Sequence, residues 1–185
     1  KFIDLKVLSS DHKKIIKQGK KLNFQIIKRN KKNAGDLVSD FEIIQEVLQK
    51  LKKKKLFFDI LIYLQPTSPI RKIKHLKNSL DILIKNNLNA AWSVSKVNKK
   101  YHPLKILKVN NNKLKLFSKL GKKIVARQQL EDIYIRNGIF YIFKTNAILK
   151  NKSIYLEKTL ASVSNYDYIN IDDNKDLEIA RKLIK

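Results

Sequence analysis

The sequence predicts an α/β protein with three layers, in which helices cover both faces of a mostly parallel sheet. Apolar runs typical of buried strands, such as residues 57–63, alternate with segments whose apolar residues recur at helical spacing. Strands that alternate with helices are joined by crossover connections, which favour parallel pairing. The chain has 185 residues, and 43% of them are hydrophobic, enough for one domain with a sizeable core. We therefore expect a single domain over residues 1–185.

The first half of the chain carries the most regular alternation. The helix predicted over 36–51 has the clearest amphipathic pattern, with its apolar residues on one stripe: Leu37, Phe41, Ile44, Val47, Leu48 and Leu51. A second helical stripe consists of Ile73, Leu76, Leu80 and Leu83. The predicted elements are, in order, a strand ending at Val7 to Ser9, a short helix from Asp11 to about Lys20, a strand at Leu22 to Ile27, the helix Asp36 to Leu51, a strand at 57–64, a helix from Arg71 to Asn87 and a strand at Ala90 to Val97.

The pattern changes between about Lys99 and Glu131, where short strand-like pieces are separated by asparagine and lysine. We expect this segment, 99–131, to be an insertion outside the main sheet. Regular structure resumes afterwards, and the predicted elements are a strand at Gly138 to Phe143, a short helix near Ala147, a strand at Tyr168 to Ile171 and a helix from Asp173 to Ile184.

The formal net charge of +25 suggests a nucleic-acid-binding protein, but the kind of basic residue argues against that class. Only five of the 41 basic residues are arginine, whereas surfaces that recognise phosphates or bases usually favour the bidentate guanidinium. Lysine, asparagine and isoleucine abound together, as an AT-rich coding sequence would produce. A non-catalytic polyanion-binding protein stays open as the main alternative, with steep salt dependence of binding as its signature.

The composition sets three further limits. Without cysteine there is no disulfide framework and no thiolate site. No apolar stretch approaches the length of about 20 residues that spans a membrane. The sequence has no methionine and begins at Lys1, so we expect upstream sequence to be missing.

The most informative segment is the octapeptide at 64–71, Leu-Gln-Pro-Thr-Ser-Pro-Ile-Arg, which directly follows the apolar run 57–63. Ligands of open α/β sheets bind at the carboxyl ends of strands. Gln65, held between a strand and the stiff Pro66 and Pro69, is therefore a predicted contact for a polar substrate.

This octapeptide resembles the signature of the acylneuraminate cytidylyltransferases, or CMP-sialic acid synthetases. Six further matches to that family occur in the same order along essentially the whole chain. They are Ser9-Ser10-Asp11, Arg29 with Ala34-Gly35-Asp36, His102-Pro103-Leu104-Lys105, Arg127-Gln128-Gln129-Leu130, Asn137-Gly138 with Tyr141, and Ile171-Asp172.

The resemblance implies a Rossmann-like nucleotidyltransferase that transfers CMP from CTP to the anomeric hydroxyl of a nine-carbon keto sugar acid. Pyrophosphate would be released, with Mg²⁺ as cofactor. It also implies a homodimer, with segment 99–131 as the dimerisation and acceptor segment, and a role in lipopolysaccharide or capsule biosynthesis. From the soluble composition and the need for CTP, we expect a cytoplasmic location. No covalent protein nucleophile is needed, because the sugar hydroxyl attacks the α-phosphorus in line.

Asp172 is the residue that the resemblance assigns to the metal. A strand-end carboxylate can bind Mg²⁺ beside substrate oxygens, since this cation often takes only one or two protein carboxylates. From spacing alone, a helix cap before the last helix is the better interpretation of Asp172, and the resemblance reverses this preference. The family usually has another aspartate two residues earlier, where this chain has Asn170.

By the same resemblance, five or six residues line the acceptor site: Gln65, Lys105, Arg127, Asn137, Tyr141 and, more loosely aligned, Tyr155. Lys105 and Arg127 suit the sugar carboxylate and the leaving phosphates, and they are candidate catalytic residues together with Asp172. Each has a structural alternative: a solvated lysine for Lys105, a turn for Asn137-Gly138 and a core aromatic for Tyr141.

On the nucleotide side, the resemblance points to Arg29, Ala34, Gly35 and Asp36 as cytidine contacts. The alternative for Gly35 is a plain loop before a helix. The family's Arg/Gly-rich triphosphate loop has no counterpart in this sequence. We therefore expect the chain alone to bind CTP poorly and to turn over slowly or not at all, whereas the parent with its amino terminus is active. A degenerate relative that keeps the fold without catalysis is a third hypothesis.

Overall fold

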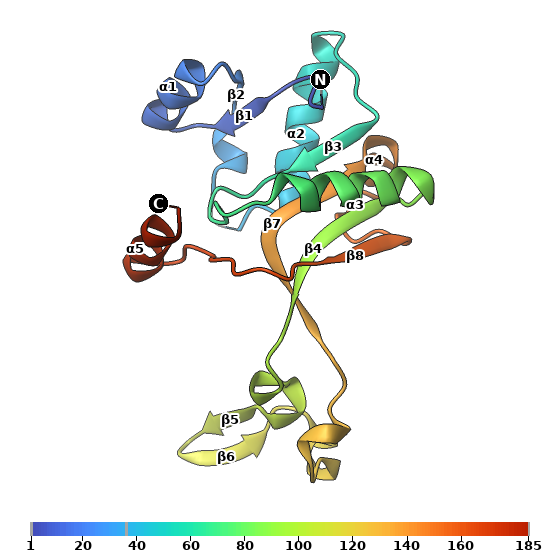
Figure 1. Ribbon diagram of the computed structural model, residues 1–185. Coiled ribbons are helices and arrows are strands. Elements are labelled where there is room, and N and C mark those ends of the chain that lie inside the picture. Colours follow the sequence, from blue (N-terminus) through green and yellow to red (C-terminus); the bar gives the residue numbers. More distant parts are fainter. Residues whose placement is uncertain (1, 36, 185) are drawn as a thin grey trace. The chain divides into compact units, whose positions relative to one another are not determined.

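A computed structural model describes residues 2–35 and 37–184. The chain forms two compact units, Lys1–Leu61 with Lys144–Glu157, and Ile62–Phe143 with Lys158–Lys185. Each unit is described by itself. The predicted α/β class is confirmed, because helices and strands alternate through both units (Figure 1). The insertion also lies where the sequence predicts it, in the second unit. The expectation of a single domain stays a prediction.

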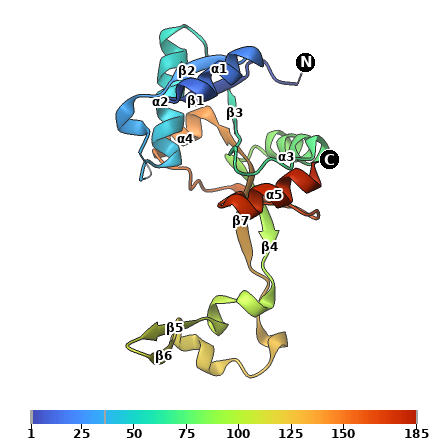
Figure 2. The ribbon, with the colours of Figure 1, turned by 90° about the vertical axis from the view of Figure 1, so that its left-hand side faces the viewer.

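The first unit contains a pair of parallel strands with helices beside it. Its elements are β1 (Val7–Ser10), α1 (Lys13–Lys21), β2 (Gln25–Lys28), the 3-10 turn η1 (Lys31–Asn33), α2 (Asp40–Lys53) and α4 (Thr145–Asn151). Figure 2 shows α1 alongside β1 and β2. Gly19 permits this packing, since a Cβ there would lie 2.2 Å from Leu8 Cδ2 and 2.9 Å from Ile26 Cδ1.

Helix α2 supplies the core of the first unit. Its buried stripe matches the sequence pattern at Ile44, Val47, Leu48 and Leu51. Its predicted start at Asp36 lies outside the described residues, and the helix begins at Asp40. Ser39 caps it, because its hydroxyl accepts from the Glu42 backbone N–H while the Glu42 carboxylate accepts from Ser39 N. The expectation that Leu37 belongs to the stripe is wrong: this side chain precedes the cap and is fully exposed.

The second unit is built on a four-stranded sheet of order β3-β7-β4-β8. Strand β4 pairs in parallel with β8, and β7 runs antiparallel to β4, with a bulge between Trp92 and Val94. The elements, beginning with the strand that leads from the first unit, are β3 (Ile60–Tyr63), α3 (Ile73–Lys85), β4 (Ala90–Lys96), η2 (Lys99–Tyr101), η3 (Pro103–Lys105), β5 (Leu107–Asn110), β6 (Lys113–Leu116), η4 (Lys119–Lys123), η5 (Arg127–Gln129), β7 (Tyr134–Lys144), β8 (Thr159–Val163) and α5 (Asn174–Leu183).

The core of the second unit lies between this sheet and α3. Residues 137–143 of β7 and 90–95 of β4 are buried throughout, as expected for central strands covered on both faces. Leu76 and Leu83 of α3 pack toward β4 and β8, which confirms the predicted stripe at these two positions.

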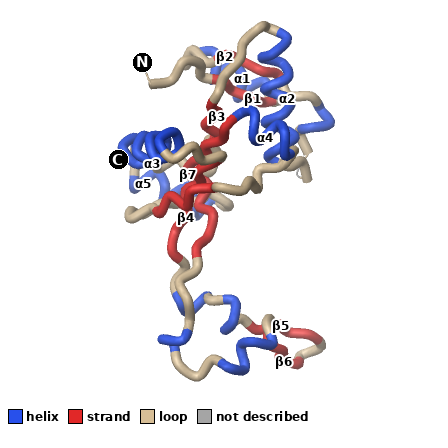
Figure 3. The backbone as a smooth tube through the Cα atoms, turned by 90° about the vertical axis from the view of Figure 1, so that its right-hand side faces the viewer, coloured by secondary structure: helices blue, strands red, loops and turns tan. Residues whose placement is uncertain are grey.

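The insertion leaves the sheet on a two-stranded ribbon formed by β4 and β7, which remain paired as far as Lys96 and Tyr134 (Figure 3). Beyond the ribbon, β5 and β6 form an antiparallel hairpin. Its two turn residues, Asn111 and Asn112, both have positive φ, the geometry of the tight turns that match strand twist.

One predicted strand is wrong. Residues 168–171 form no strand, although Ile171 N donates to Thr67 O at 2.8 Å. The last strand of the sheet is instead β8, which the sequence analysis missed because its serine-containing pattern is short and only partly apolar. Among the described residues, none of the helices has the length and apolar character needed to cross a bilayer.

Candidate active site

The loop at 64–71 leaves β3 and is fastened to the neighbouring strand by its last residue. Arg71 Nε donates to Ile139 O at 2.8 Å, and Arg71 Nη2 donates to Gln65 O. Burial of this guanidinium lowers the pKa of Arg71 from its ordinary value. The arginine thus fixes both ends of the loop, which holds the partly buried Gln65 at the carboxyl end of the strand, as predicted.

Gly138 allows the closest approach in this region. Its φ is +69°, a conformation that side chains other than glycine rarely adopt. A Cβ at this position would lie 2.6 Å from Gln65 Oε1, 2.6 Å from Ser68 Oγ and 3.4 Å from Asn170 Oδ1. Three polar side chains from the loop and from the segment before α5 therefore converge on a backbone position without a side chain.

Ser68 links these segments and was not singled out by the sequence analysis. It is 1% exposed, and its hydroxyl lies 3.0 Å from Asn137 O and 2.8 Å from Asn170 Oδ1. A signal existed, because the serine belongs to the octapeptide that carries the resemblance. Its partners could not be found from the sequence, since they lie 69 and 102 positions away.

The Asn137 side chain is buried and hydrogen-bonded to other groups of the protein. It is 1% exposed; Nδ2 donates to Ser95 Oγ at 2.9 Å and to Ser164 Oγ at 2.8 Å, while Oδ1 accepts from Ile139 N. Both amide hydrogens are thus used inside the protein, which favours a scaffold role. Direct binding of the acceptor by Asn137 stays a prediction.

Tyr141 has similar surroundings in the middle of β7. It is 3% exposed, and its ring lies against those of Tyr63, Trp92 and Phe143. The structure therefore favours the core-aromatic alternative for this residue.

Asp172 is exposed at the end of the segment that contacts the loop. The cap of α5 is its neighbour Asp173, whose Oδ1 accepts from Asp176 N at 2.9 Å. Asp176 Oδ2 in turn accepts from the backbone N–H groups of Asp172 and Asp173. The capping interpretation of the Asp172 side chain is therefore wrong, and within the part of the chain that the structure describes its carboxylate has no hydrogen-bond partner.

The donor set around Asp172 fits a substrate-assisted magnesium site. Over residues 2–35 and 37–184, no group of three or more histidine, aspartate or glutamate side chains is arranged to hold a metal. One exposed carboxylate is what a hydrated Mg²⁺ bound mainly by substrate phosphates would require. Asn170 Oδ1 accepts from Ser68, so this neighbouring oxygen already has a partner.

Lys105 and Arg127 lie beside the same pocket in the insertion, and their assignment to the acceptor site stays a prediction. Both line a pocket of about 250 Å³, whose other walls are Leu104, Leu116, Gly121, Ile124, Val125 and Ala126. Both cations are exposed, and η3 and η5 bring them to the same pocket from positions 22 residues apart in the printed sequence. Two cations beside one pocket can bind a carboxylate or a phosphate.

The predicted nucleotide residues belong to the first unit. Arg29 lies at the end of β2, where Nη2 donates to Ser9 O at 2.9 Å and Nε to Ser9 Oγ at 3.3 Å. Ala34 and Gly35 follow η1, and no heavy atom lies within 4 Å of a Cβ built on Gly35. Asp36 lies outside the described residues. Tyr155 is also in this unit and is 68% exposed.

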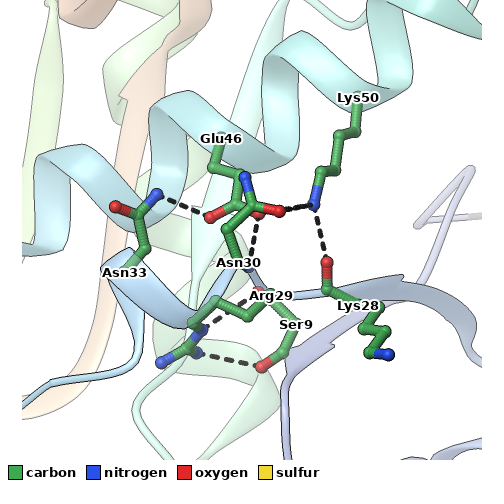
Figure 4. Close-up of polar contacts among 7 residues, drawn as sticks. All are labelled: Ser9, Lys28, Arg29, Asn30, Asn33, Glu46 and Lys50. Atoms are coloured by element: carbon green, nitrogen blue, oxygen red, sulfur yellow. Dashed lines mark hydrogen bonds and ion pairs between the residues drawn. The ribbon is translucent and has the colours of Figure 1, made fainter.

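A buried glutamate, which the sequence analysis missed, anchors the loop after Arg29 (Figure 4). Glu46 of α2 is 6% exposed and accepts from Asn30 N at 2.8 Å, from Asn33 Nδ2 at 2.6 Å and from Lys50 Nζ. Lys50 Nζ also donates to Lys28 O at 2.6 Å. Burial alone raises the pKa of Glu46, but the hydrogen bonds from Lys50, Asn33 and Asn30 outweigh it and lower the pKa. An acidic residue inside an apolar helical stripe was the available signal.

Several known proteins of similar sequence are named as synthases or cytidylyltransferases of sugar acids. The chain is 31% identical over 163 residues to the CMP-N,N'-diacetyllegionaminic acid synthase of Legionella pneumophila, covering 85% of this chain and 67% of that protein. It is 27% identical over 185 residues to the pseudaminic acid cytidylyltransferase of Campylobacter jejuni, covering 97% and 77%. An N-acylneuraminate cytidylyltransferase of Streptococcus agalactiae is 24% identical over 136 residues, and the match spans only 32% of that longer protein.

The fold is shared with a solved CMP:2-keto-3-deoxy-manno-octonic acid synthetase in complex with CTP. The TM-score is 0.66 at 15% identity, over 98% of this chain and 81% of that one. No protein-family model matches the sequence. The family assignment rests on the Legionella relative, which is 31% identical to this chain over a match that covers 67% of the relative. The chain belongs to the acylneuraminate cytidylyltransferase family of nucleotidyltransferases.

Proposed function

We propose that this protein transfers CMP from CTP to the anomeric hydroxyl of a nonulosonic, sialic-type acid and releases pyrophosphate. The observation that carries the proposal is the similarity to the legionaminic and pseudaminic acid enzymes over 85–97% of the chain. The polar cluster around Gly138 supports it, because Gln65, Ser68 and Asn170 meet there beside the exposed Asp172.

The residues of the chain have separable tasks in this proposal. Gln65 hydrogen-bonds a hydroxyl of the acceptor sugar, while Arg71 and Ser68 keep its loop in place. Lys105 and Arg127 bind the sugar carboxylate and the leaving phosphates through charge-assisted hydrogen bonds. Arg29 contacts the cytidine, and Glu46 holds the loop that follows it. Catalysis rests on positioning and charge neutralisation, as is usual for transfers at phosphorus.

We propose Asp172 as the protein ligand of Mg²⁺. When bound, the cation neutralises phosphate charge and helps to align the α-phosphorus with the sugar hydroxyl. The Asp172 carboxylate is not needed to cap helix α5, because Asp173 and Asp176 form the cap.

A homodimer formed through the insertion is part of the proposal. The insertion exposes large apolar side chains that a second copy would cover, among them Val109 (70%), Leu114 (68%) and Val125 (92%). Sedimentation analysis tests it: we expect a dimer that Leu114→Asp converts to a monomer, while Ile73→Asp, an equally exposed position at 68% on α3, leaves the dimer intact. A monomeric wild type refutes it. Because CTP is the donor, we place the reaction in the cytoplasm.

The deciding experiment measures CMP transfer from CTP to a panel of nine-carbon keto sugar acids in the presence of Mg²⁺. Asp172→Asn should abolish product, whereas Asp167→Asn, an exposed aspartate of the same segment, should leave it unchanged. Equal losses in the two variants would show that Asp172 has no special role. A wild type that transfers CMP to none of the acids would contradict the proposed function of this chain.

A further inference from the structure

We call residues 164–172, which lie between β8 and the cap residue of α5, the strap. Hydrogen bonds hold the strap at both of its ends. At its start, Ser164 N donates to Val94 O at 2.9 Å, and Ser164 Oγ accepts from Asn137. At its end, Asn170 Oδ1 accepts from Ser68, and Ile171 N donates to Thr67 O. Asp172 follows directly. The strap therefore carries the proposed metal ligand to the loop at 64–71.

A third attachment holds the middle of the strap, in a part of the molecule that the proposed reaction does not use. The hydroxyl of Tyr166 lies 3.1 Å from His75 Nδ1, on α3. The opposite ring nitrogen, Nε2, lies 2.6 Å from Ser162 Oγ, on β8. The Tyr166 ring packs edge-on against the His75 ring and lies under the Lys72 ammonium, 4.6 Å from the ring centroid. One imidazole thus joins the strap, α3 and β8.

The hydrogen positions in this cluster follow from the donor count. Ser79 Oγ donates its only hydrogen to His75 O at 2.8 Å, so in the 2.5 Å contact between Ser79 and Ser162 the donor is Ser162. Ser162 Oγ has no hydrogen left, and His75 Nε2 must therefore carry the proton that bridges to it. In a neutral imidazole Nδ1 is then an acceptor, which receives the Tyr166 hydroxyl hydrogen.

This arrangement requires an uncharged imidazole. A second proton would occupy Nδ1, and the Tyr166 hydroxyl would have to turn its hydrogen away. The surroundings oppose that proton: the Phe140 ring lies edge-on at 5.0 Å, and the charged groups on the Tyr166 side, Lys72 and Arg71, are both cations. Burial accordingly lowers the pKa of His75 from its ordinary value of 6.5.

We propose that His75 and Tyr166 are positioning residues, which hold the strap in the register that presents Asp172 beside the Gln65 loop. Neither residue is among those assigned to the proposed substrates. This inference rests on the proposed function only where it assigns a use to Asp172. The attachment of the strap by His75 and Tyr166 does not depend on that function. Above the pKa of His75 the fastening is intact, and it opens as the pH falls through that pKa.

Hydrogen exchange of the strap amides tests the fastening without any need for activity. In Tyr166→Phe we expect the Ile171 amide to exchange about 5-fold faster, the effect of losing one buried hydrogen bond. The matched control is Tyr168→Phe, the same change two residues along the strap. In this variant we expect the exchange rate of the Ile171 amide to rise by less than about 2-fold. In the wild type, protection of Ile171, corrected for intrinsic exchange, should fall as the pH drops below 6.5, and His75→Gln should abolish this dependence.

Equal exchange in the two tyrosine variants would overturn the proposal, and so would the same pH dependence in His75→Gln as in the wild type. In the CMP-transfer assay, Tyr166→Phe should lower kcat and raise the KM for Mg²⁺, because Asp172, the proposed ligand of the cation, is displaced. A fall in kcat no larger than that of Tyr168→Phe would contradict the positioning role. A wild type without transfer would refute the proposed function and leave the exchange result standing.

Discussion

Gly138→Ala is the substitution whose cost can be worked out most directly from the structure. The residue has a φ of +69°, and for an alanine this left-handed backbone costs about 1–2 kcal/mol. The new Cβ would also lie 2.6 Å from both Gln65 Oε1 and Ser68 Oγ, closer than any real contact. Gln65 can swing its amide aside, but Ser68 is buried and bonded on two sides. Displacing it costs about a further 1–2 kcal/mol, and we expect a total loss of about 3 kcal/mol.

Urea unfolding measures this loss. The single tryptophan, Trp92 on β4, is 9% exposed and reports on the unit that contains Gly138. Gly35→Ala is the matched control, followed by circular dichroism because Gly35 belongs to the first unit. Nothing lies within 4 Å of its Cβ position, so we expect a change within about 0.5 kcal/mol of zero.

A cost below about 1 kcal/mol for Gly138→Ala would refute the reasoning, because it would mean that the loop at 64–71 yields freely. An equal cost at Gly35 would do so as well, since the effect would then belong to glycine removal in general. Loss of CMP transfer without loss of stability would indicate displacement of Gln65 alone.

Three further predictions concern the buried polar groups. Ser68→Ala should lower the free energy of unfolding by about 1–3 kcal/mol because it leaves the buried Asn137 O without the Ser68 hydroxyl, whereas Thr67→Ala, which removes only an exposed side chain, should cost less than about 0.5 kcal/mol in the same urea titration. Glu46→Gln should cost about 1–3 kcal/mol, since the amide cannot accept all the hydrogen bonds of the carboxylate; the exposed Glu178→Gln is the control, and equal costs would contradict this. The lowered pKa of Glu46 predicts that the stabilisation from its carboxylate is complete above the ordinary pKa of 4.5 and is lost as the pH falls through the folded-state pKa. The reason is that the unfolded carboxyl binds a proton first as the pH falls. The free energies of unfolding of the wild type and Glu46→Gln, measured from pH 7 to 3, should therefore converge at the acid end.

The sequence predicted those parts of the fold whose signal is local. Helix α2 and helix α3 follow from apolar periodicity, β7 from the largely apolar run 138–143, and the insertion from the change of pattern after residue 99. The same local signal failed at 168–171, where apolar residues suggest a strand. That segment forms no ladder, and Asn170 and Ile171 are instead fixed by hydrogen bonds to Ser68 and Thr67.

The candidate site was predictable in residue type and only partly in geometry. Gln65 lies at a strand end, and Lys105 and Arg127 line one pocket of the insertion, while their roles stay predictions. Asn137 and Tyr141 are buried, and no pattern in the sequence distinguishes an asparagine that binds a ligand from one that satisfies Ser95 and Ser164. Glu46 was missed for the same reason, since the partners that stabilise it come from a loop in another part of the sequence.

Asn170 gives a last prediction that joins the strap to the chemistry. Its Oδ1 accepts from Ser68, and a carboxylate at this position could accept the same hydrogen bond with one oxygen and keep the other free. Asn170→Asp therefore adds a negative charge two residues from Asp172 without removing an anchor. If Asp172 binds Mg²⁺, this charge should tighten Mg²⁺-dependent CTP binding about 5- to 10-fold, a gain of about 1 kcal/mol, as expected for charges near the surface.

Calorimetric titration of CTP at fixed Mg²⁺ measures the effect, and Asn165→Asp provides the same charge on the same strap, five residues earlier. We expect the gain only in Asn170→Asp, and we expect it to vanish when Asp172→Asn is added. An equal gain in both single variants would show a general electrostatic effect. A gain that survives the loss of Asp172 would mean that residue 170, rather than Asp172, determines where the metal lies.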